Sequence, residues 1–217
     1  MQCMKNIGIL GSGEVGKTLA RGFLNHGYSV MVGTRSPQAI KEWKSEFGEN
    51  FKIGSPQETA KYGEILVLAV KGSASLNALK NAGESNLKGK IIIDTTNPIS
   101  DEPHDNGVLR FFSQINLSLM ETLQKEFSRA HFVKAFNSIG NVFMVNPEFK
   151  EKPTMFICGN SREAKSEVRT ICEQFGFEVE DMGGVEGARA IEPLCILWCI
   201  PGFLRNEWSH AFRLVKK

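Results

Sequence analysis

The stretch IGILGSGEVG at residues 7–16 decides the fold of this chain, because a short apolar strand, a glycine-rich turn and the start of a helix follow one another within it. In such a turn Gly11 permits the sharp change of direction, Gly13 lets the backbone approach a phosphate, and Gly16 lets the helix pack closely on the strand. The N-terminus of the helix adds unpaired N–H donors. This order is typical of a site that binds the pyrophosphate of a dinucleotide.

Strand and helix patterns alternate from this turn to the end of the chain. Continuous apolar runs at residues 65–70 and 91–93 are typical of strands buried on both faces of a parallel sheet. The alternation continues to residue 204 without a linker, repeat or low-complexity tract. We therefore predict a single domain over residues 1–217 with an α/β, doubly wound, mostly parallel sheet of about seven to eight strands and a C-terminal helix, the Rossmann fold that binds NAD(P).

The residues after the second strand pattern select the dinucleotide. A site for NAD usually places Asp or Glu there, where the carboxylate accepts hydrogen bonds from the ribose. This chain has Thr34, Arg35 and Ser36 instead. The guanidinium of Arg35 suits a phosphate, and the two hydroxyls add neutral donors. The sequence therefore favours NADP(H), with a solvated loop as the alternative interpretation of Arg35.

Three further strand patterns end at the sheet edge that carries the glycine turn, where ligands of open α/β sheets bind. The residues at these ends are Val70 and Lys71, then Asn97, then Asn137. We expect them to line the nicotinamide end of the site. For Asn97, a polar turn before Pro98 is an interpretation that stays equally open.

The composition argues against several classes of function. The net charge is +2 and the charges are interspersed, which leaves no basic stripe for nucleic acid and no polybasic block for a membrane surface. The N-terminus lacks the pattern of a signal peptide. The longest apolar run, residues 194–203, is shorter than the roughly 20 residues of a membrane helix. We expect a cytoplasmic protein with a small-molecule partner.

The cysteines are Cys3, Cys158, Cys172, Cys195 and Cys199. Their odd number, their scatter and the lack of a CxxC pair favour reduced, mostly buried thiols. Cys195 and Cys199 are four residues apart on a predicted helix, but no histidine is close to them in sequence. We therefore interpret this pair as core packing and predict no metal site.

Two segments near the predicted site carry several interpretations. Residues 100–116 contain Pro and Gly and mixed charges, which predicts a loop over the sheet edge of the kind that often covers an active site. The last helix pattern, residues 190–204, carries the apolar side chains of Leu194, Leu197, Trp198 and Phe203. That face suits a homodimer interface, a pocket for an electron acceptor or ordinary core packing.

Several stretches in matching order resemble one family. They are residues 7–16, 32–37, 133–137, 155–159 and 190–194. The chain resembles the deazaflavin-dependent NADP reductases along nearly its whole length. In residues 134–137 and 191–198 it is even more similar to the cytoplasmic reductase domain of the STEAP metalloreductases.

The resemblance implies that NADPH binds at the sheet edge and passes hydride to a flavin-type ring. By position it assigns the pyrophosphate to Ser12, Gly13, Glu14 and Val15, the 2′-phosphate to Thr34, Arg35 and Ser36, and the nicotinamide and ribose to Val70, Asn97 and Asn137. The chain departs from the deazaflavin reductases at Lys71-Gly72, where they have a proline and an aromatic residue, and at Asn137, where they have a histidine. These departures count against deazaflavin as the substrate. The chain ends where the metalloreductases enter the membrane, so we expect no transmembrane electron transfer from this chain alone.

We therefore expect an NADP-dependent oxidoreductase that transfers hydride between NADP(H) and a flavin or deazaflavin as co-substrate. No catalytic side chain is predicted, because the two ring systems carry the chemistry. One rival interpretation is a sensor or partner subunit that binds NADP(H) without turnover. Another is a reductase of small carbonyl or imine substrates, which is expected to carry a proton donor and a sizeable helical second domain.

Overall fold

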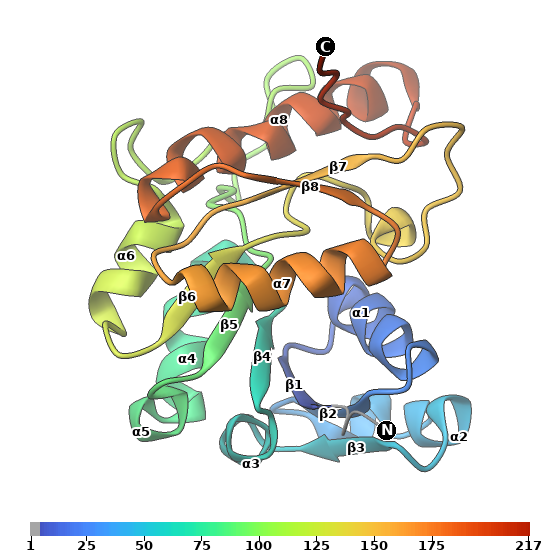
Figure 1. Ribbon diagram of the computed structural model, residues 1–217, viewed down its shortest axis with the longest axis vertical. Helices are drawn as coiled ribbons and strands as arrows, with labels where there is room; N and C mark the ends of the chain where they lie inside the picture. Colours follow the sequence, from blue (N-terminus) through green and yellow to red (C-terminus); the bar gives the residue numbers. More distant parts are fainter. Residues whose placement is uncertain (1–4) are drawn as a thin grey trace.

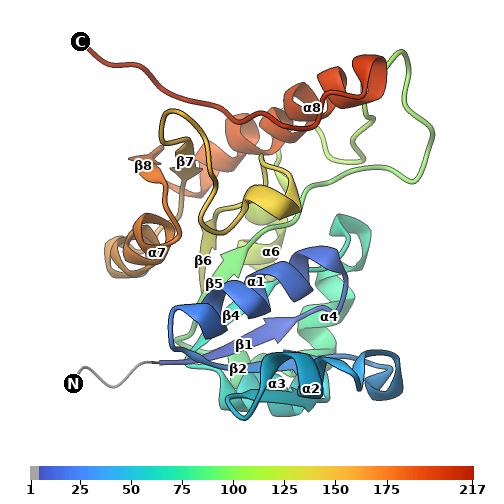
Figure 2. The same ribbon diagram turned by 90° about the vertical axis from the view of Figure 1, so that its right-hand side faces the viewer.

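The computed structural model describes residues 5–217 and contains a six-stranded sheet with helices on both faces (Figures 1 and 2). The strands of this sheet are β1 (Asn6–Leu10), β2 (Ser29–Gly33), β3 (Phe51–Gly54), β4 (Ile65–Leu68), β5 (Ile91–Asp94) and β6 (His131–Lys134). Their order is β3-β2-β1-β4-β5-β6, and all neighbours are parallel. The predicted doubly wound Rossmann fold is confirmed.

The α-helices divide between the two faces of this sheet. They are α1 (Glu14–Asn25), α2 (Trp43–Phe47), α3 (Pro56–Tyr62), α4 (Ser75–Ala82), α5 (Glu84–Leu87), α6 (Leu119–Glu126), α7 (Arg162–Gln174) and α8 (Ala188–Arg205). Four 3-10 turns lie at Pro37–Ile40, Gly72–Ala74, Asn141–Phe143 and Val185–Gly187. Buried side chains of α1 and α7 join one core cluster, whereas those of α3, α4, α5, α6 and α8 join the other.

The continuous apolar run of β4 is buried on both faces, as its pattern predicts. Ile65 and Val67 belong to the core cluster that contains α1 and α7. Leu66 and Leu68 belong to the cluster on the opposite face. Because successive side chains of a strand point to opposite faces, a strand between two helical layers needs apolar residues at every position.

The expected strand count of the main sheet is too high. The last two strands, β7 (Thr154–Ile157) and β8 (Glu178–Asp181), pair with each other and form a separate two-stranded parallel sheet. A single antiparallel bridge from Lys134 to Cys158 connects β7 to β6. The other side of β7 is occupied by the C-terminal tail, where Thr154 N–H donates to Phe212 O at 2.9 Å. With both edges of β7 in use, the six-stranded sheet ends at β6.

Residues 98–112 form a loop, as predicted, and backbone hydrogen bonds fold it into a hairpin-like arm. Ser100 N–H donates to Arg110 O at 2.8 Å, and Phe112 N–H donates to Pro98 O at 2.9 Å. The ring of His104 in this arm packs against the ring of Phe203 on α8, with centroids 4.3 Å apart. The arm therefore leaves the sheet edge just after Asn97 and reaches along α8.

Candidate functional site

The carboxyl ends of β1 and β2 border a cavity of 300 Å³. The sheet order reverses between β1 and β4, which is where open α/β sheets bind their ligands. Among the residues that line the cavity are six of the predicted site: Gly11, Ser12, Thr34, Arg35, Ser36 and Val70. The remaining lining residues are apolar, small or amide side chains, and none is acidic.

The structure explains the three glycines of the turn in different ways. Gly11 has φ +129°, and a Cβ there would lie 2.0 Å from Ala69 O. A Cβ on Gly16 would lie 2.3 Å from Gly11 O, so the close approach of α1 to the turn depends on it. A Cβ on Gly13 would have no atom within 4 Å. The chain itself requires glycine at positions 11 and 16. At Gly13 the missing side chain leaves open space above the turn.

Helix α1 begins directly behind this open space. Its N-cap is Gly13, which supplies no side-chain hydrogen bond to the first turn. The side chain of Glu14 is exposed and that of Val15 is partly buried, so neither covers the helix end. The first N–H groups of a helix lack intrahelical acceptors and carry the positive end of its dipole. The turn therefore presents donors to an anion.

A hydroxyl pair joins the two turns that border the cavity. Ser12 Oγ donates to Thr34 Oγ1 at 3.0 Å, and the same oxygen accepts from Ser36 N–H at 3.1 Å. The Arg35 side chain is exposed and forms no hydrogen bond or ion pair within residues 5–217. A free guanidinium and two nearby hydroxyls thus lie beside the glycine turn.

Two asparagines bond to each other at the ends of β5 and β6. Asn97 Nδ2 donates to Asn137 O at 2.7 Å, and Asn137 Nδ2 donates to Asn97 Oδ1 and to Ile191 O, both at 3.0 Å. Asn137 Oδ1 is buried and has no hydrogen-bond partner in the described chain. The two Nδ2 bonds fix the orientation of this amide, so its oxygen is a free acceptor.

The turn after β4 connects the cavity to the asparagine pair. A Cβ on Gly72 would lie only 2.0 Å from Asn97 O, so this turn lies directly against Asn97. Val70, two residues earlier, lines the cavity. Lys71 points away from both, because its side chain is exposed and its Nζ lies 3.2 Å from Asp101 Oδ1. The structure therefore brings the predicted residues together in two adjoining groups and leaves the Lys71 side chain outside them.

A buried ion cluster that the sequence reasoning missed lies next to the asparagines. Lys134 is fully buried, and its Nζ lies 2.7 Å from Asp94 Oδ2 and 2.9 Å from Glu192 Oε1. It also donates to Thr96 O at 2.8 Å. Burial alone lowers the pKa of a lysine, but the two carboxylates outweigh it and raise the pKa of Lys134 above its ordinary value.

Glu192 ties this cluster to two helices. It lies on α8, and its carboxylate accepts from Leu119 N–H and Met120 N–H, both at 3.0 Å, at the N-terminus of α6. A signal in the sequence points to such a cluster: Lys134 interrupts an apolar strand and Glu192 an apolar helix, and buried charges need partners. Which charges meet is decided by the fold.

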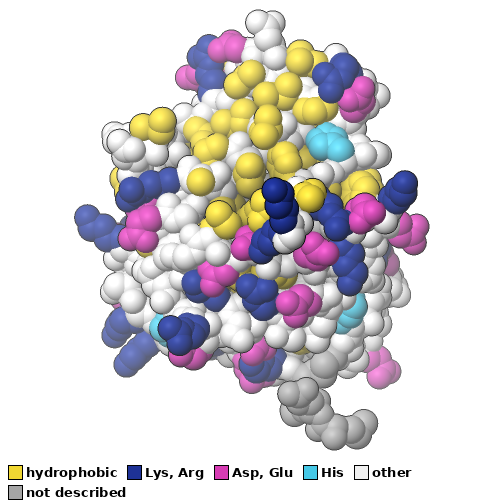
Figure 3. All heavy atoms as spheres, turned by 45° about the horizontal axis from the view of Figure 1, so that its top comes forward, with side chains coloured by type: hydrophobic (Ala, Val, Ile, Leu, Met, Phe, Trp, Pro, Cys, Tyr) yellow, Lys and Arg dark blue, Asp and Glu magenta, His cyan; other side chains and the backbone are white. Residues whose placement is uncertain are grey.

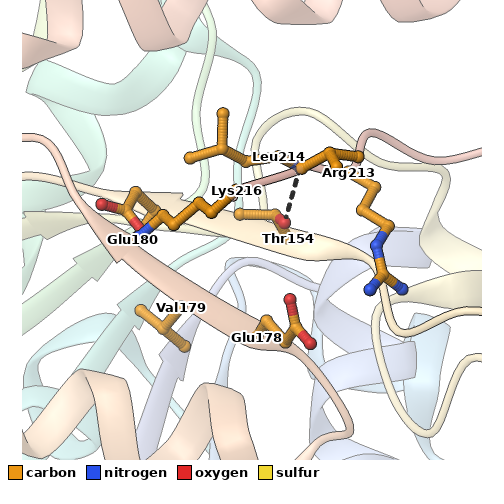
Figure 4. A pocket seen from close by; sticks show the side chains of 8 residues that line it. Thr154, Glu178, Val179, Glu180, Arg213, Leu214 and Lys216 are labelled. Atoms are coloured by element: carbon orange, nitrogen blue, oxygen red, sulfur yellow. Dashed lines mark hydrogen bonds and ion pairs between the residues drawn. The ribbon is translucent and has the colours of Figure 1, made fainter.

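A larger cavity, of 330 Å³, lies away from the glycine turn, between β7, β8 and the C-terminal tail (Figure 4). Three of its four charged side chains are paired: Lys216 bonds to Glu180, and Arg213 bonds to Glu151, whereas Glu178 has no partner within residues 5–217. Leu214 N–H donates to Thr154 Oγ1 at 3.0 Å. These contacts fasten the tail to β7, and volume alone does not make this groove the site.

Helix α8 has a core side and an exposed apolar side. Trp198 is buried and its Nε1 donates to His210 O at 2.9 Å, whereas Leu197 and Phe203 are exposed. Figure 3 shows apolar side chains gathered on this end of the molecule. Core packing therefore explains only part of the apolar pattern.

Within the described chain, residues 185–205 are the one segment whose length and composition would allow it to cross a membrane, although core helices of folded domains meet the same criteria.

The thiols are placed largely as predicted. Cys158, Cys172 and Cys195 are buried free cysteines, and Cys199 is partly buried. Burial raises the pKa of Cys158 to about 12, so this thiol stays protonated and unreactive. Cys3 and the rest of residues 1–4 lie outside the described residues.

Known proteins resemble this chain in sequence and in fold. Residues 6–98, which hold β1 to β5 and both turns, match the family described as NADP oxidoreductase, coenzyme F420-dependent. The chain is 31% identical over 204 residues to metalloreductase STEAP3 of Rattus norvegicus, covering 91% of this chain and 38% of that protein. It is 26% identical over 193 residues to metalloreductase STEAP2 of Homo sapiens, covering 87% and 35%. The chain thus spans less than half the length of these relatives.

Solved structures extend the similarity over the full chain. A protein from Arthrobacter sp. FB24, proposed to be an F420-dependent NADP reductase, has a TM-score of 0.91 and 29% identity, covering 98% of this chain and 100% of that one. An imine reductase of Streptomyces aurantiacus has a TM-score of 0.68 at 14% identity, covering 92% and 63%, and shows the fold alone. The resemblance found in the sequence is confirmed: residues 6–98 match the coenzyme F420-dependent NADP oxidoreductase family, and over most of its length the chain is similar to the STEAP metalloreductases and to the Arthrobacter protein.

Proposed function

We propose that this chain binds NADPH and transfers hydride from it to a flavin- or deazaflavin-type acceptor. The observation that carries the proposal is the hydroxyl pair of Ser12 and Thr34, which joins the two turns around a cavity with a free Arg35 and no acidic side chain. A carboxylate beside this cavity would repel a 2′-phosphate. The guanidinium and the hydroxyls present can instead donate hydrogen bonds to a 2′-phosphate.

The adenosine end of NADP(H) would lie in the 300 Å³ cavity. Arg35 offers a planar, permanently charged donor group to the 2′-phosphate, and Ser36 and Thr34 add hydroxyls within the same turn. The pyrophosphate would lie over Gly13, where a Cβ meets no other atom and the N–H groups of α1 point outward.

The nicotinamide end would lie against the asparagine pair. Asn137 Oδ1 is buried without a partner, which costs free energy unless a ligand donor reaches it. The carboxamide N–H of a nicotinamide is such a donor. Asn97 Oδ1 and Ile191 O both accept hydrogen bonds from Asn137 Nδ2, so the acceptor oxygen has one orientation.

The chemistry needs little from titrating side chains. Bound NADPH supplies a hydride, a proton with its electron pair, to the acceptor ring, which also takes up one proton from water. The asparagines at the proposed transfer point do not titrate, and their part is to position the ring. The side chains of Arg35, Ser36 and Thr34 hold the far end of the cofactor.

The relatives support the coarser part of the proposal, NADPH-dependent oxidoreduction. The family description names an F420-dependent NADP oxidoreductase, and the curated relatives are named metalloreductases. The acceptor of this chain is our proposal and stands on the site geometry. A cytoplasmic location is likewise proposed, on the support of the buried, protonated thiols.

A homodimer through α8 is a third proposal, because Leu197, Phe203 and Leu204 leave an apolar face uncovered. Light scattering of the purified chain measures this directly. A monomer at all concentrations would remove the dimer and leave the hydride-transfer proposal unaffected.

The experiment that tests the function compares the wild-type chain with Arg35→Asp. We expect NADPH to bind the wild type at least tenfold more tightly than NADH, and Arg35→Asp to abolish or reverse that preference. Arg162→Asp, at an exposed arginine on α7, serves as the matched control. Unchanged preference in Arg35→Asp would remove Arg35 from the site.

The acceptor is tested in the same preparation by following NADPH oxidation with riboflavin, FMN, FAD, a deazaflavin, ferric chelates and small imines. Oxidation by a flavin-type compound supports the proposal. Oxidation by an imine alone would favour an imine reductase, and tight NADPH binding with no oxidation would favour a sensor.

A further inference from the structure

Three buried charged side chains lie beside the asparagine pair, and the proposed hydride transfer does not yet use them. Asp94, Lys134 and Glu192 are the only charged side chains that are buried within residues 5–217. Burying a charge costs free energy unless an opposite charge pairs with it. Two carboxylates share one ammonium group here, so pairing leaves one negative charge without a counterpart.

The fold brings the three side chains to one face of the sheet. Asp94 and Lys134 end the neighbouring strands β5 and β6 and are partners in the register of the sheet. They follow Ile92 and Phe132 by two residues and so point to the same face, which packs against α6 and α8. Glu192 reaches this face from α8, with its Oε1 2.9 Å from Lys134 Nζ.

The hydrogen bonds show that both carboxylates are charged. Asp94 Oδ1 accepts from Thr96 N–H at 2.9 Å and from Thr96 Oγ1 at 2.7 Å. The Glu192 carboxylate accepts from Leu119 N–H and Met120 N–H, both at 3.0 Å. Each carboxylate therefore meets donors in these contacts, and donors favour its ionised form.

Nearby positive charges do not cancel the remaining negative charge. The two carboxylates raise the pKa of Lys134 above its ordinary value, so its ammonium group stays charged but balances only one of them. The dipole of α6, whose first N–H groups bond to Glu192, offsets roughly half a charge. The guanidinium of Arg189 is balanced by the carboxylate of Glu121.

Two short connections place this charge beside the proposed nicotinamide position. Lys134 Nζ donates at 2.8 Å to the carbonyl of residue 96, which immediately precedes Asn97. Glu192 immediately follows residue 191, whose carbonyl accepts from Asn137 Nδ2 at 3.0 Å. Over so short a path through the interior of a protein, a charge acts more strongly than it does in water.

We propose that the net negative charge shared by Asp94, Lys134 and Glu192 stabilises the positively charged ring of bound NADP⁺ and so favours the loss of hydride from NADPH. The inference rests on the proposed function and adds the residues that set the direction of the reaction. Hydride loss turns the neutral ring of NADPH into a cation, while the acceptor gains the electron pair and takes up a proton from water. A fixed negative charge stabilises the positive charge as it develops in the transition state.

A purely structural role of the cluster predicts a different result. If the three side chains only held the asparagine pair in place, the loss of one carboxylate would weaken the binding of NADPH and NADP⁺ by the same factor. A charge acts on the cationic ring and hardly at all on the neutral one. The ratio of the two dissociation constants therefore separates the two roles.

The test measures that ratio by isothermal titration calorimetry on the full chain. Glu192→Gln and Asp94→Asn each remove the uncompensated charge. We expect each to raise the Kd for NADP⁺, relative to the Kd for NADPH, about 3- to 10-fold. 2′-Phospho-ADP-ribose, which lacks the nicotinamide, should bind both variants as it binds the wild type.

Two controls separate charge from structural damage. Glu126→Gln makes the same chemical change at an exposed position of α6 and should leave the ratio unchanged. Lys134→Met combined with Glu192→Gln alters the cluster more than Glu192→Gln does, but it keeps one negative charge, on Asp94. Its ratio should match that of the wild type, and a ratio as altered as in Glu192→Gln would assign the effect to structure.

The inference is overturned if Glu192→Gln and Asp94→Asn both keep the ratio of the wild type, and that result leaves the NADP(H) site standing. Should neither variant fold, the wild type alone decides: tighter binding of NADP⁺ than of NADPH supports the inference, and tighter binding of NADPH overturns it. A wild type that binds neither nucleotide would contradict the proposed function and the inference with it.

Discussion

Thr34 Oγ1 accepts a hydrogen bond of 3.0 Å from Ser12 Oγ, although the two residues follow different strands of the sheet. The same oxygen also accepts a hydrogen bond of 3.1 Å from the backbone N–H of Ser36. One buried hydroxyl therefore fixes the spacing between the glycine turn after β1 and the basic turn after β2. The pyrophosphate and the 2′-phosphate of one cofactor lie at a fixed distance from each other, so the two turns that would bind them need a constant spacing.

Thr34→Val removes this hydroxyl at nearly constant volume. We expect NADPH affinity to fall about 3- to 10-fold, because the loss of one or two hydrogen bonds lets the two turns separate. The melting temperature should change little. Titration with NADPH measures the effect, and Thr170→Val, on the exposed surface of α7, is the control. Equal affinity for NADPH in Thr34→Val and the wild type would show that the hydroxyl does not organise the site.

The same substitution at two glycines should have opposite effects. Gly16→Ala places a Cβ 2.3 Å from Gly11 O, so we expect a loss of about 1–3 kcal/mol in the free energy of unfolding. Gly13→Ala meets no protein atom within 4 Å, so the chain should remain stable. Its Cβ would occupy the proposed phosphate position, and NADPH affinity should fall at least tenfold.

Urea unfolding and NADPH titration of both glycine variants provide the comparison. Full NADPH affinity in Gly13→Ala would show that the open space above the turn is not used by the cofactor. Wild-type stability of Gly16→Ala would show that α1 can move away from the turn.

Lys134→Met leaves the carboxylates of Asp94 and Glu192 buried without their cation. We expect a loss of about 3–5 kcal/mol in the free energy of unfolding, because an uncompensated buried charge is costly. Lys134→Met combined with Glu192→Gln removes one of the two charges and should be less destabilised than Lys134→Met alone. Urea unfolding measures both, with Lys125→Met on the exposed side of α6 as control. Equal stability of Lys134→Met and the control would contradict the ion cluster.

Acid should weaken the contact between α6 and α8 through Glu121. Hydrogen bonds from Arg189 first, and then from Ser118, lower the pKa of Glu121 from 4.5 to about 2, against the opposing effect of burial. A carboxyl group with a lowered pKa stabilises the fold above its unfolded pKa, and that contribution is lost as the pH falls from about 4.5 to about 2. Arg189 is partly exposed, so solvent screens the ion pair, and we expect Glu121 to contribute about 1 kcal/mol to the free energy of unfolding.

Glu121→Gln should therefore flatten the pH dependence of stability in that window. Urea unfolding of wild type and variant at pH 6 and at acid pH measures the difference. A variant with the same acid slope as the wild type would assign the acid sensitivity to other carboxylates.

Much of the local structure could be predicted because it depends on neighbours in sequence. Ser55, Pro56 and Glu58 predict a helix start, and the structure has the full capping box there, with Glu58 N–H donating to Ser55 Oγ at 3.2 Å. Ser118 and Glu121 form the same capping box at the start of α6.

Other elements depended on contacts that no local pattern contains. Pro37 and the spacing of Ile40, Trp43 and Phe47 predict one helix over residues 37–47, but the structure divides this segment into a 3-10 turn and the short α2. Strands β7 and β8 have ordinary strand patterns, yet they form a sheet of their own because the tail takes the free edge of β7. Strand patterns predict that a segment is extended and not which segment it pairs with.

The sequence by itself determined the glycine turn, the strand before it, the helix after it and the choice of Arg35 where NAD sites carry an acid. These features follow from backbone freedom and side-chain chemistry over a few adjacent residues. Only the tertiary structure decided that Lys134 meets Asp94 and Glu192, and that Asn137 Oδ1 is left buried and unpaired. Burial makes a partner necessary for every charge and polar group, but which partner is within reach depends on how α6, α8 and the sheet edge pack together.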